Sequence, residues 1–106
     1  MSRQIAQRYR TLVSEVRGCC QELSSQAPAA QTAYKRLGQA CEVLQEWEEA
    51  VGEVSQLKRE QALTPVLLKS HNRLDQARLA LSAGEEQQAQ RIWQLQLDLY
   101  RLLNDL

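Results

Sequence analysis

The chain has 106 residues, which suits one domain with a single core and leaves little room for a second lobe. Thirteen basic residues balance thirteen acidic ones, so the composition argues against a nucleic-acid binder and favours a protein partner. Leu, Gln, Ala, Glu and Arg dominate, with few glycines, two prolines and no phenylalanine. This composition is typical of long helices and predicts one all-α domain over residues 1–106.

The cysteines and the hydropathy pattern indicate in which cellular compartment the protein is expected. Three cysteines, with Cys19 and Cys20 adjacent, do not resemble the paired framework of a small secreted domain. No run approaches the roughly 18 apolar residues of a membrane span, and the N-terminal residues lack the apolar core of a signal peptide. We therefore expect a cytoplasmic protein without a membrane span.

A helix is predicted over residues 2–24, because apolar residues recur there at alternating spacings of four and three. They are Ile5, Tyr9, Leu12, Val16, Cys19 and Leu23. A polar break ends this helix, and Pro28 suits the first turn of the next one. The short loop predicts that the two helices are antiparallel.

The second helix is predicted over residues 29–63, on the same spacing of apolar residues. They are Ala33, Leu37, Ala40, Leu44, Trp47, Val51 and Val54. At about 1.5 Å per residue this helix would be about 50 Å long, well beyond its neighbour. Gly52 lowers helix stability by roughly 1 kcal/mol relative to alanine, so we expect any bend there.

Thr64 and Pro65 predict a helix boundary, because threonine is a good N-cap and proline fits the first helical position. A third helix is expected over residues 65–82, with Leu67, Leu74 and Leu81 seven residues apart. A fourth is expected over residues 85–106. The short connection between them predicts a tight hairpin.

The fourth helix carries two apolar stripes. The first gives the seam of a bundle and comprises Ile92, Leu95, Leu99, Leu102 and Leu106. The second lies on the adjoining outer face and comprises Trp93, Leu97, Tyr100 and Leu103. The four helices together predict an elongated antiparallel four-helix bundle made of two helical hairpins with a long second helix. The alternative is a three-helix bundle, in which Thr64 and Pro65 would only kink a longer helix.

The second stripe is the predicted interaction surface. Large apolar side chains are costly to leave in water, and Leu68 and Leu79 extend this surface onto the third helix. Trp and Tyr are frequent anchors at protein interfaces. We therefore expect Trp93, Leu97, Tyr100 and Leu103 to bind a protein partner or a second copy of the chain. The alternative is that the end of the second helix, with Leu57 and Leu63, folds back over them.

Charged residues form two further stripes. Arg3, Arg10 and Arg17 recur every seven residues on the first helix, and the acidic stripe on the second comprises Glu42, Glu46, Glu49 and Glu53. Exposed charge is stable without a partner, so both stripes can simply be solvated faces. The alternatives are steering of a complementary chain, pairing within a dimer, or weak nucleic-acid binding through the arginines.

Residues that could carry chemistry are few. His71, the single histidine, lies on the predicted third helix, which is similar to histidine phosphotransfer domains, but the lysine and glycine-rich turn of those domains are missing. Cys19 and Cys20 project about 100° apart on a helix, so they cannot easily share one zinc ion, and Cys41 lies far along the chain. No catalytic triad or phosphate-binding loop appears, so we predict neither an enzyme nor a cofactor or metal site.

Residues 59–65 and the hairpin after them resemble the C-terminal helical domain shared by the steroid receptor RNA activator protein and the COPII outer coat. That resemblance covers under half of the chain, and no function or site is transferred from it. In size and pattern the chain is also similar to small helical secretion chaperones and assembly factors. The sequence therefore predicts a non-enzymatic interaction module of the adaptor, assembly-factor or chaperone type. The alternatives are a phosphotransfer protein using His71 and a weak nucleic-acid binder.

Overall fold

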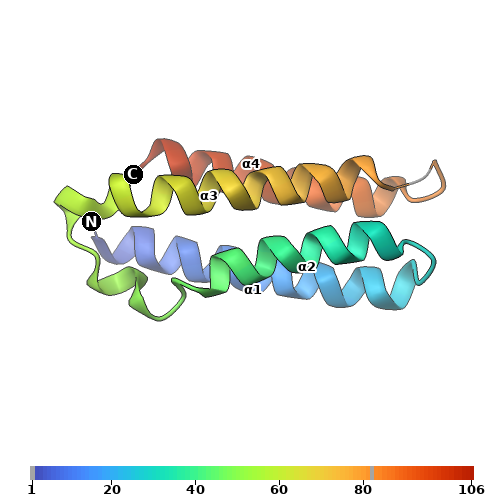
Figure 1. Ribbon diagram of the computed structural model, residues 1–106, viewed down its shortest axis with the longest axis horizontal. Coiled ribbons are helices and arrows are strands. Elements are labelled where there is room, and N and C mark those ends of the chain that lie inside the picture. Colours follow the sequence, from blue (N-terminus) through green and yellow to red (C-terminus); the bar gives the residue numbers. More distant parts are fainter. Residues whose placement is uncertain (1, 82) are drawn as a thin grey trace.

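The computed structural model describes residues 2–81 and 83–106, and they form two helical hairpins that lie side by side (Figure 1). The helices are α1 (Ser2–Gln26), α2 (Gln31–Gln45), α3 (Gln56–Leu79) and α4 (Glu86–Asn104), with the short 3-10 helix η1 (Ala50–Glu53) between α2 and α3. The molecule measures 44 × 21 × 17 Å. The predicted elongated four-helix bundle is confirmed. Within the described residues, no helix combines the length and apolar character needed to cross a membrane.

The core lies where the apolar seams meet. All six predicted seam residues of α1, from Ile5 to Leu23, are buried, and so are Ile92, Leu95, Leu99 and Leu102 of α4. Leu81 and Leu106, at the ends of their seams, are only partly buried against this core. Heptad spacing therefore predicted the inward faces of α1 and α4 correctly, because a bundle buries one stripe of each helix.

The predicted long second helix is wrong, because α2 ends at Gln45 and the chain leaves α-helical geometry until Gln56. Glu42, Glu46, Glu49 and Glu53 would be like-charge neighbours four and three residues apart, and such pairs destabilise a helix. Gly52, where a bend was expected, lies within the interruption and weakens helix further.

The predicted boundary at Thr64 and Pro65 is also wrong, because both residues lie inside α3. Proline within a helix costs about 3 kcal/mol, since it removes one hydrogen bond and crowds the preceding turn. Leu63 and Leu67 flank it and are fully buried, and each burial contributes roughly 1.5 to 3 kcal/mol. Pro65 itself faces solvent, so the two buried leucines hold the helix on both sides of the defect.

The remaining helix ends differ from the prediction by a few residues. Helix α1 continues to Gln26 and α2 begins at Gln31, so Pro28 lies in the turn between them and not in a first helical turn. Helix α3 ends at Leu79, whereas the predicted end at Ser82 lies outside the described residues. Helix α4 begins at Glu86, one residue later than expected, and ends at Asn104, two residues before the predicted end.

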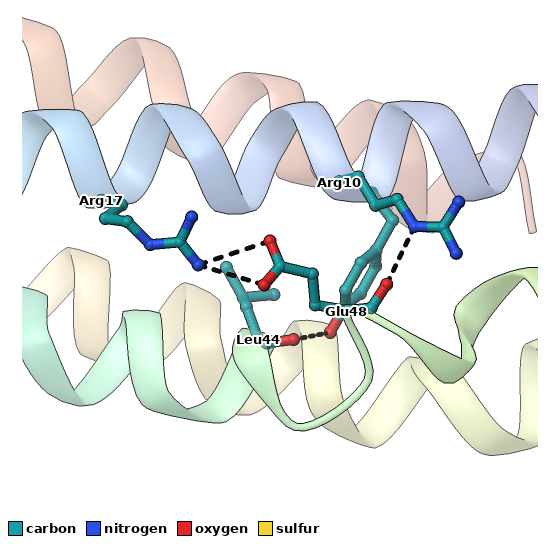
Figure 2. A network of polar contacts seen from close by, with 5 residues as sticks. Arg10, Arg17, Leu44 and Glu48 are labelled. Atoms are coloured by element: carbon teal, nitrogen blue, oxygen red, sulfur yellow. Dashed lines mark hydrogen bonds and ion pairs between the residues drawn. The ribbon is translucent and has the colours of Figure 1, made fainter.

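Side chains of α1 hold the interrupted segment between α2 and α3 (Figure 2). Tyr9 is fully buried and donates its hydroxyl to the backbone carbonyl of Leu44. Arg10 donates to the backbone carbonyls of Glu48 at 2.9 Å and Glu49 at 3.1 Å. Arg17 pairs with the Glu48 carboxylate at 3.1 Å. These bonds attach the end of α2 and the segment that follows it to α1.

Small residues allow α2 and α3 to pack closely. Ala33 and Ala40 of α2, together with Ser70 and Ala77 of α3, have no exposed surface. The Ser70 hydroxyl donates to the backbone carbonyl of Ala40 at 3.0 Å. This buried hydroxyl therefore has its hydrogen-bond partner on the neighbouring helix. The two hairpins are thereby joined through the middle of the bundle.

Replacing Pro65 with alanine tests whether α3 is continuous. Alanine restores the missing hydrogen bond in a helix interior, so P65A should raise the free energy of unfolding by roughly 1 to 3 kcal/mol. Chemical denaturation of parent and variant measures this difference. P28A, in the turn between α1 and α2, is the matched control and should bring no comparable gain. A neutral or destabilising P65A would instead support a helix that begins at Pro65.

Candidate functional site

Large apolar side chains are exposed mainly on one hairpin. The exposed set comprises Tyr34 on α2, Leu57, Leu68 and Leu79 on α3, and Trp93 and Tyr100 on α4. Five of these six belong to α3 and α4, so the apolar surface is concentrated on the second hairpin. Leu68, Leu79, Trp93 and Tyr100 were predicted from the sequence as surface residues, whereas Leu57 was placed in the alternative that covers the stripe.

On α3 the exposed leucines lie along one line. Leu57, Leu68 and Leu79 are spaced 11 residues apart, which is close to three full helical turns. Asp75 lies seven residues after Leu68 and four before Leu79, so it shares this side of the helix. It accepts a hydrogen bond from Gln96 of α4 at 3.1 Å. The leucine line therefore lies on the side of α3 that adjoins α4.

On α4 the aromatic residues flank the same junction. Arg78 of α3 lies with its guanidinium carbon 5.2 Å from the centre of the Trp93 ring. Tyr100 follows Trp93 by seven residues, and Leu97 lies between them, so the three share one side of α4. We call the surface formed by Leu57, Leu68, Leu79, Trp93, Leu97 and Tyr100 the hairpin face.

A polar cluster beneath the hairpin face fixes Trp93. The Arg78 guanidinium donates to Asp75 at 2.7 Å and to the amide oxygen of Gln96 at 3.1 Å. Gln96 is buried and donates its own amide N–H to Asp75. The hydrogen bonds from Arg78 and then from Gln96 hold the pKa of Asp75 below its usual range. Each member restrains the others, so the guanidinium is held over the Trp93 ring.

Two predictions about this surface change in the structure. The alternative, in which the end of the second helix covers the stripe with Leu57 and Leu63, is not found, since Leu63 is buried in the core and Leu57 is 96% exposed. Trp93 and Tyr100 remain 47% and 54% exposed. Leu97 is partly buried, and Leu103 packs against the core and so lies at the edge of the predicted stripe. The chain therefore leaves the hairpin face open.

The predicted acidic stripe does not lie on one helix face, because α2 ends at Gln45. Arg10 and Arg17 bind the segment after α2, and the side chain of Arg3 falls outside the described part of the structure. Glu42 is exposed on α2, whereas Glu46, Glu49 and Glu53 are exposed beyond its end. The acidic residue that pairs with Arg17 is Glu48, which the stripe did not include. The hydrogen bonds of Arg10 and Arg17 are thus used within the chain.

His71 and the three cysteines, the other candidate reactive residues, are partly or fully buried on the helices. His71 is partly buried on α3, near Asp75. Cys19 and Cys41 are buried, Cys20 is partly buried, and burial raises the pKa of all three thiols, that of Cys19 to about 11. Thiols of this kind are poor nucleophiles at neutral pH. Among residues 2–81 and 83–106, no group of three His, Cys, Asp or Glu side chains is placed to hold a metal.

A groove of about 480 Å³ between α1 and α4 is a weaker candidate for a binding site. Most of the residues that line it are polar or charged, among them Gln4, Arg8, Thr11, Asp98 and Arg101. Arg8 pairs with Asp105 at 2.8 Å and Arg101 with Asp98 at 3.6 Å, so both cations already have acidic partners. The hairpin face remains the surface with unburied apolar side chains.

Comparison of the chain with protein-family models, with curated proteins and with solved structures gives no match. Function is therefore inferred from the geometry alone.

The sequence analysis did not predict the cluster of Asp75, Arg78 and Gln96, although one signal was available. Gln96 directly follows the seam residue Leu95 and is buried at the edge of the seam. A buried polar side chain needs a hydrogen-bond partner, here on a neighbouring helix.

Acidification should weaken the Asp75 cluster. A carboxylate whose pKa is lower in the folded state stabilises the protein above its unfolded pKa, and this contribution is lost as the pH falls through the folded value. The difference in unfolding free energy between parent and D75N should therefore be largest above about pH 4 and shrink below it. Urea unfolding at several pH values measures this difference.

The control for this experiment is D98N, which removes a carboxylate that lies 3.6 Å from Arg101 and makes one long bond of 3.4 Å to Gln94. It should change the stability at neutral pH less than D75N does. A parent-minus-D75N difference that stays constant from neutral pH to below pH 3 would contradict the role assigned to Asp75.

Proposed function

We propose that this chain is a non-enzymatic helical module that binds another polypeptide, as an adaptor, assembly factor or chaperone does, through its hairpin face. The observation that carries the proposal is the concentration of exposed large apolar side chains on α3 and α4. Scattered exposed apolar residues are ordinary on a protein surface, whereas the presence of five of the six on one hairpin favours an interaction site there.

The energetics favour Trp93 and Tyr100 as anchors. Full burial of a large apolar side chain contributes roughly 1.5 to 3 kcal/mol, and these two are about half exposed in the free chain. Trp and Tyr dominate the binding energy of many interfaces. Because Arg78 holds the Trp93 ring, a partner has less side-chain entropy to remove on binding.

The hairpin face suits a helical partner. An amphipathic helix can lie along two antiparallel helices with apolar residues at successive turns. Asp75 and Arg78 neutralise one another where α3 meets α4, so this part of the hairpin face carries little net charge. We therefore expect binding that depends weakly on salt, unlike binding steered by the arginine stripe of α1.

The proposal places the protein in the cytoplasm. Cys19, Cys20 and Cys41 are free thiols, which persist in a reducing compartment. Burial keeps them protonated, so they serve as packing residues and take no part in the proposed binding.

The double variant W93A/Y100A tests this proposal. Capture from native extract should lose the proteins that the parent retains, because both anchors are removed. The unfolding midpoint and helical circular dichroism should change little, since both side chains are about half exposed. Quantitative mass spectrometry of the captured proteins measures the loss.

The matched control is Y34A, which removes an aromatic side chain of similar exposure from α2. It should retain the same proteins as the parent. If W93A/Y100A is well folded and retains all of them, the hairpin face is not the binding surface. If W93A/Y100A instead unfolds, both residues belong to the core.

A further inference from the structure

The leucine line of α3 is symmetric about its centre. Leu68 lies 11 residues after Leu57 and 11 residues before Leu79. Eleven residues make about three turns, so the three side chains project in nearly the same direction over about 33 Å. A line of this kind matches its own reverse, which is the property that a two-fold symmetric interface requires.

We propose that the hairpin face binds a second copy of this chain, with the two α3 helices antiparallel and crossing at Leu68. This inference rests on the proposed function of the hairpin face and names the partner. Leu68 then meets Leu68 of the second copy. Leu57 meets Leu79 of the second copy, and the reverse contact follows by symmetry.

The polar residues on the line are compatible with this pairing. Between the leucines lie Gln61, Thr64, Asn72 and Asp75. In the antiparallel register Asp75 faces Gln61 of the second copy, and Thr64 faces Asn72. Asp75 is the single ionised residue among these positions, so no charge on the line meets one of like sign. A parallel arrangement would bring the two Asp75 carboxylates together, which opposes it.

The exposure of Leu57 supports the same arrangement. At 96% it is the most exposed large apolar residue of the described chain, because the start of α3 extends past the C-terminal end of α4 (Figure 1). In the symmetric pair Leu57 lies over Leu79 of the second copy, beside its Trp93. The exposed leucines at opposite ends of α3 thus cover each other.

The size of the surface limits which residues the pairing must use. The leucine line covers about 33 Å of α3, within the 44 Å length of the molecule. A standard interface buries roughly 800 Å² per partner. A single packed helix pair would bury less, so the symmetric pair also needs Trp93 and Tyr100 at the margins of the interface.

Cysteine cross-linking tests the geometry. L68C alone should form a covalent dimer with a short bismaleimide reagent, because the symmetric pair brings this position against itself. L57C and L79C should each cross-link poorly alone and efficiently when mixed. Parent protein measures the background from the native thiols, and Y34C is the control for an exposed cysteine outside the hairpin face.

Sedimentation over a range of concentrations tests the pairing itself. The parent should form dimers, and L68R should raise the dissociation constant at least about tenfold, because two like charges then meet at the crossing point. Efficient cross-linking of L57C with itself, or a dimer that L68R leaves intact, would overturn the proposed arrangement. A parent that stays monomeric up to about 1 mM would overturn the second copy as partner. That result would leave the hairpin face, tested by W93A/Y100A, open to a different polypeptide.

Discussion

The fold depends on the hydrogen bonds by which α1 holds the chain between α2 and α3. The α-helical hydrogen-bond ladder of α2 stops at Gln45. Tyr9 donates to the buried carbonyl of Leu44, and Arg10 donates to the carbonyls of Glu48 and Glu49 in the segment that follows. A Cβ atom at position 52 would lie 3.3 Å from an Arg10 nitrogen, so Gly52 also leaves room for that side chain.

The place of this interruption determines which residues α3 exposes. Because the chain turns before Ser55, residues 56–64 join α3 and bring Leu63 into the core. Leu57 becomes an exposed residue at the free end of the same helix. If the turn had been at Pro65, α3 would contain the exposed Leu68 and Leu79 but not Leu57. The proposed interaction surface is thus a consequence of where α1 binds the segment between the two hairpins.

The sequence predicted much of this architecture and only part of its detail. Heptad spacing in α1 and α4 identified the buried stripes, because both helices are long and their seams uninterrupted. The break between α2 and α3 was misplaced for two reasons. The glutamates after Gln45 were interpreted as a helix face although they repel one another, and the Thr64–Pro65 pair carries a strong local signal that buried leucines override. The Asp75, Arg78 and Gln96 contacts also depend on the register of a hairpin, which periodicity alone does not give.

Residue-resolved hydrogen exchange tests the central claim most directly. Amides on both sides of Pro65, from Arg59 to Leu74, should be protected as one unit, whereas those between Glu46 and Ser55 should exchange faster. The R10A variant should accelerate exchange in the last turn of α2, because Arg10 no longer holds the carbonyls that follow it. Uniform protection from residue 46 to residue 63, with rapid exchange just after Pro65, would contradict the account.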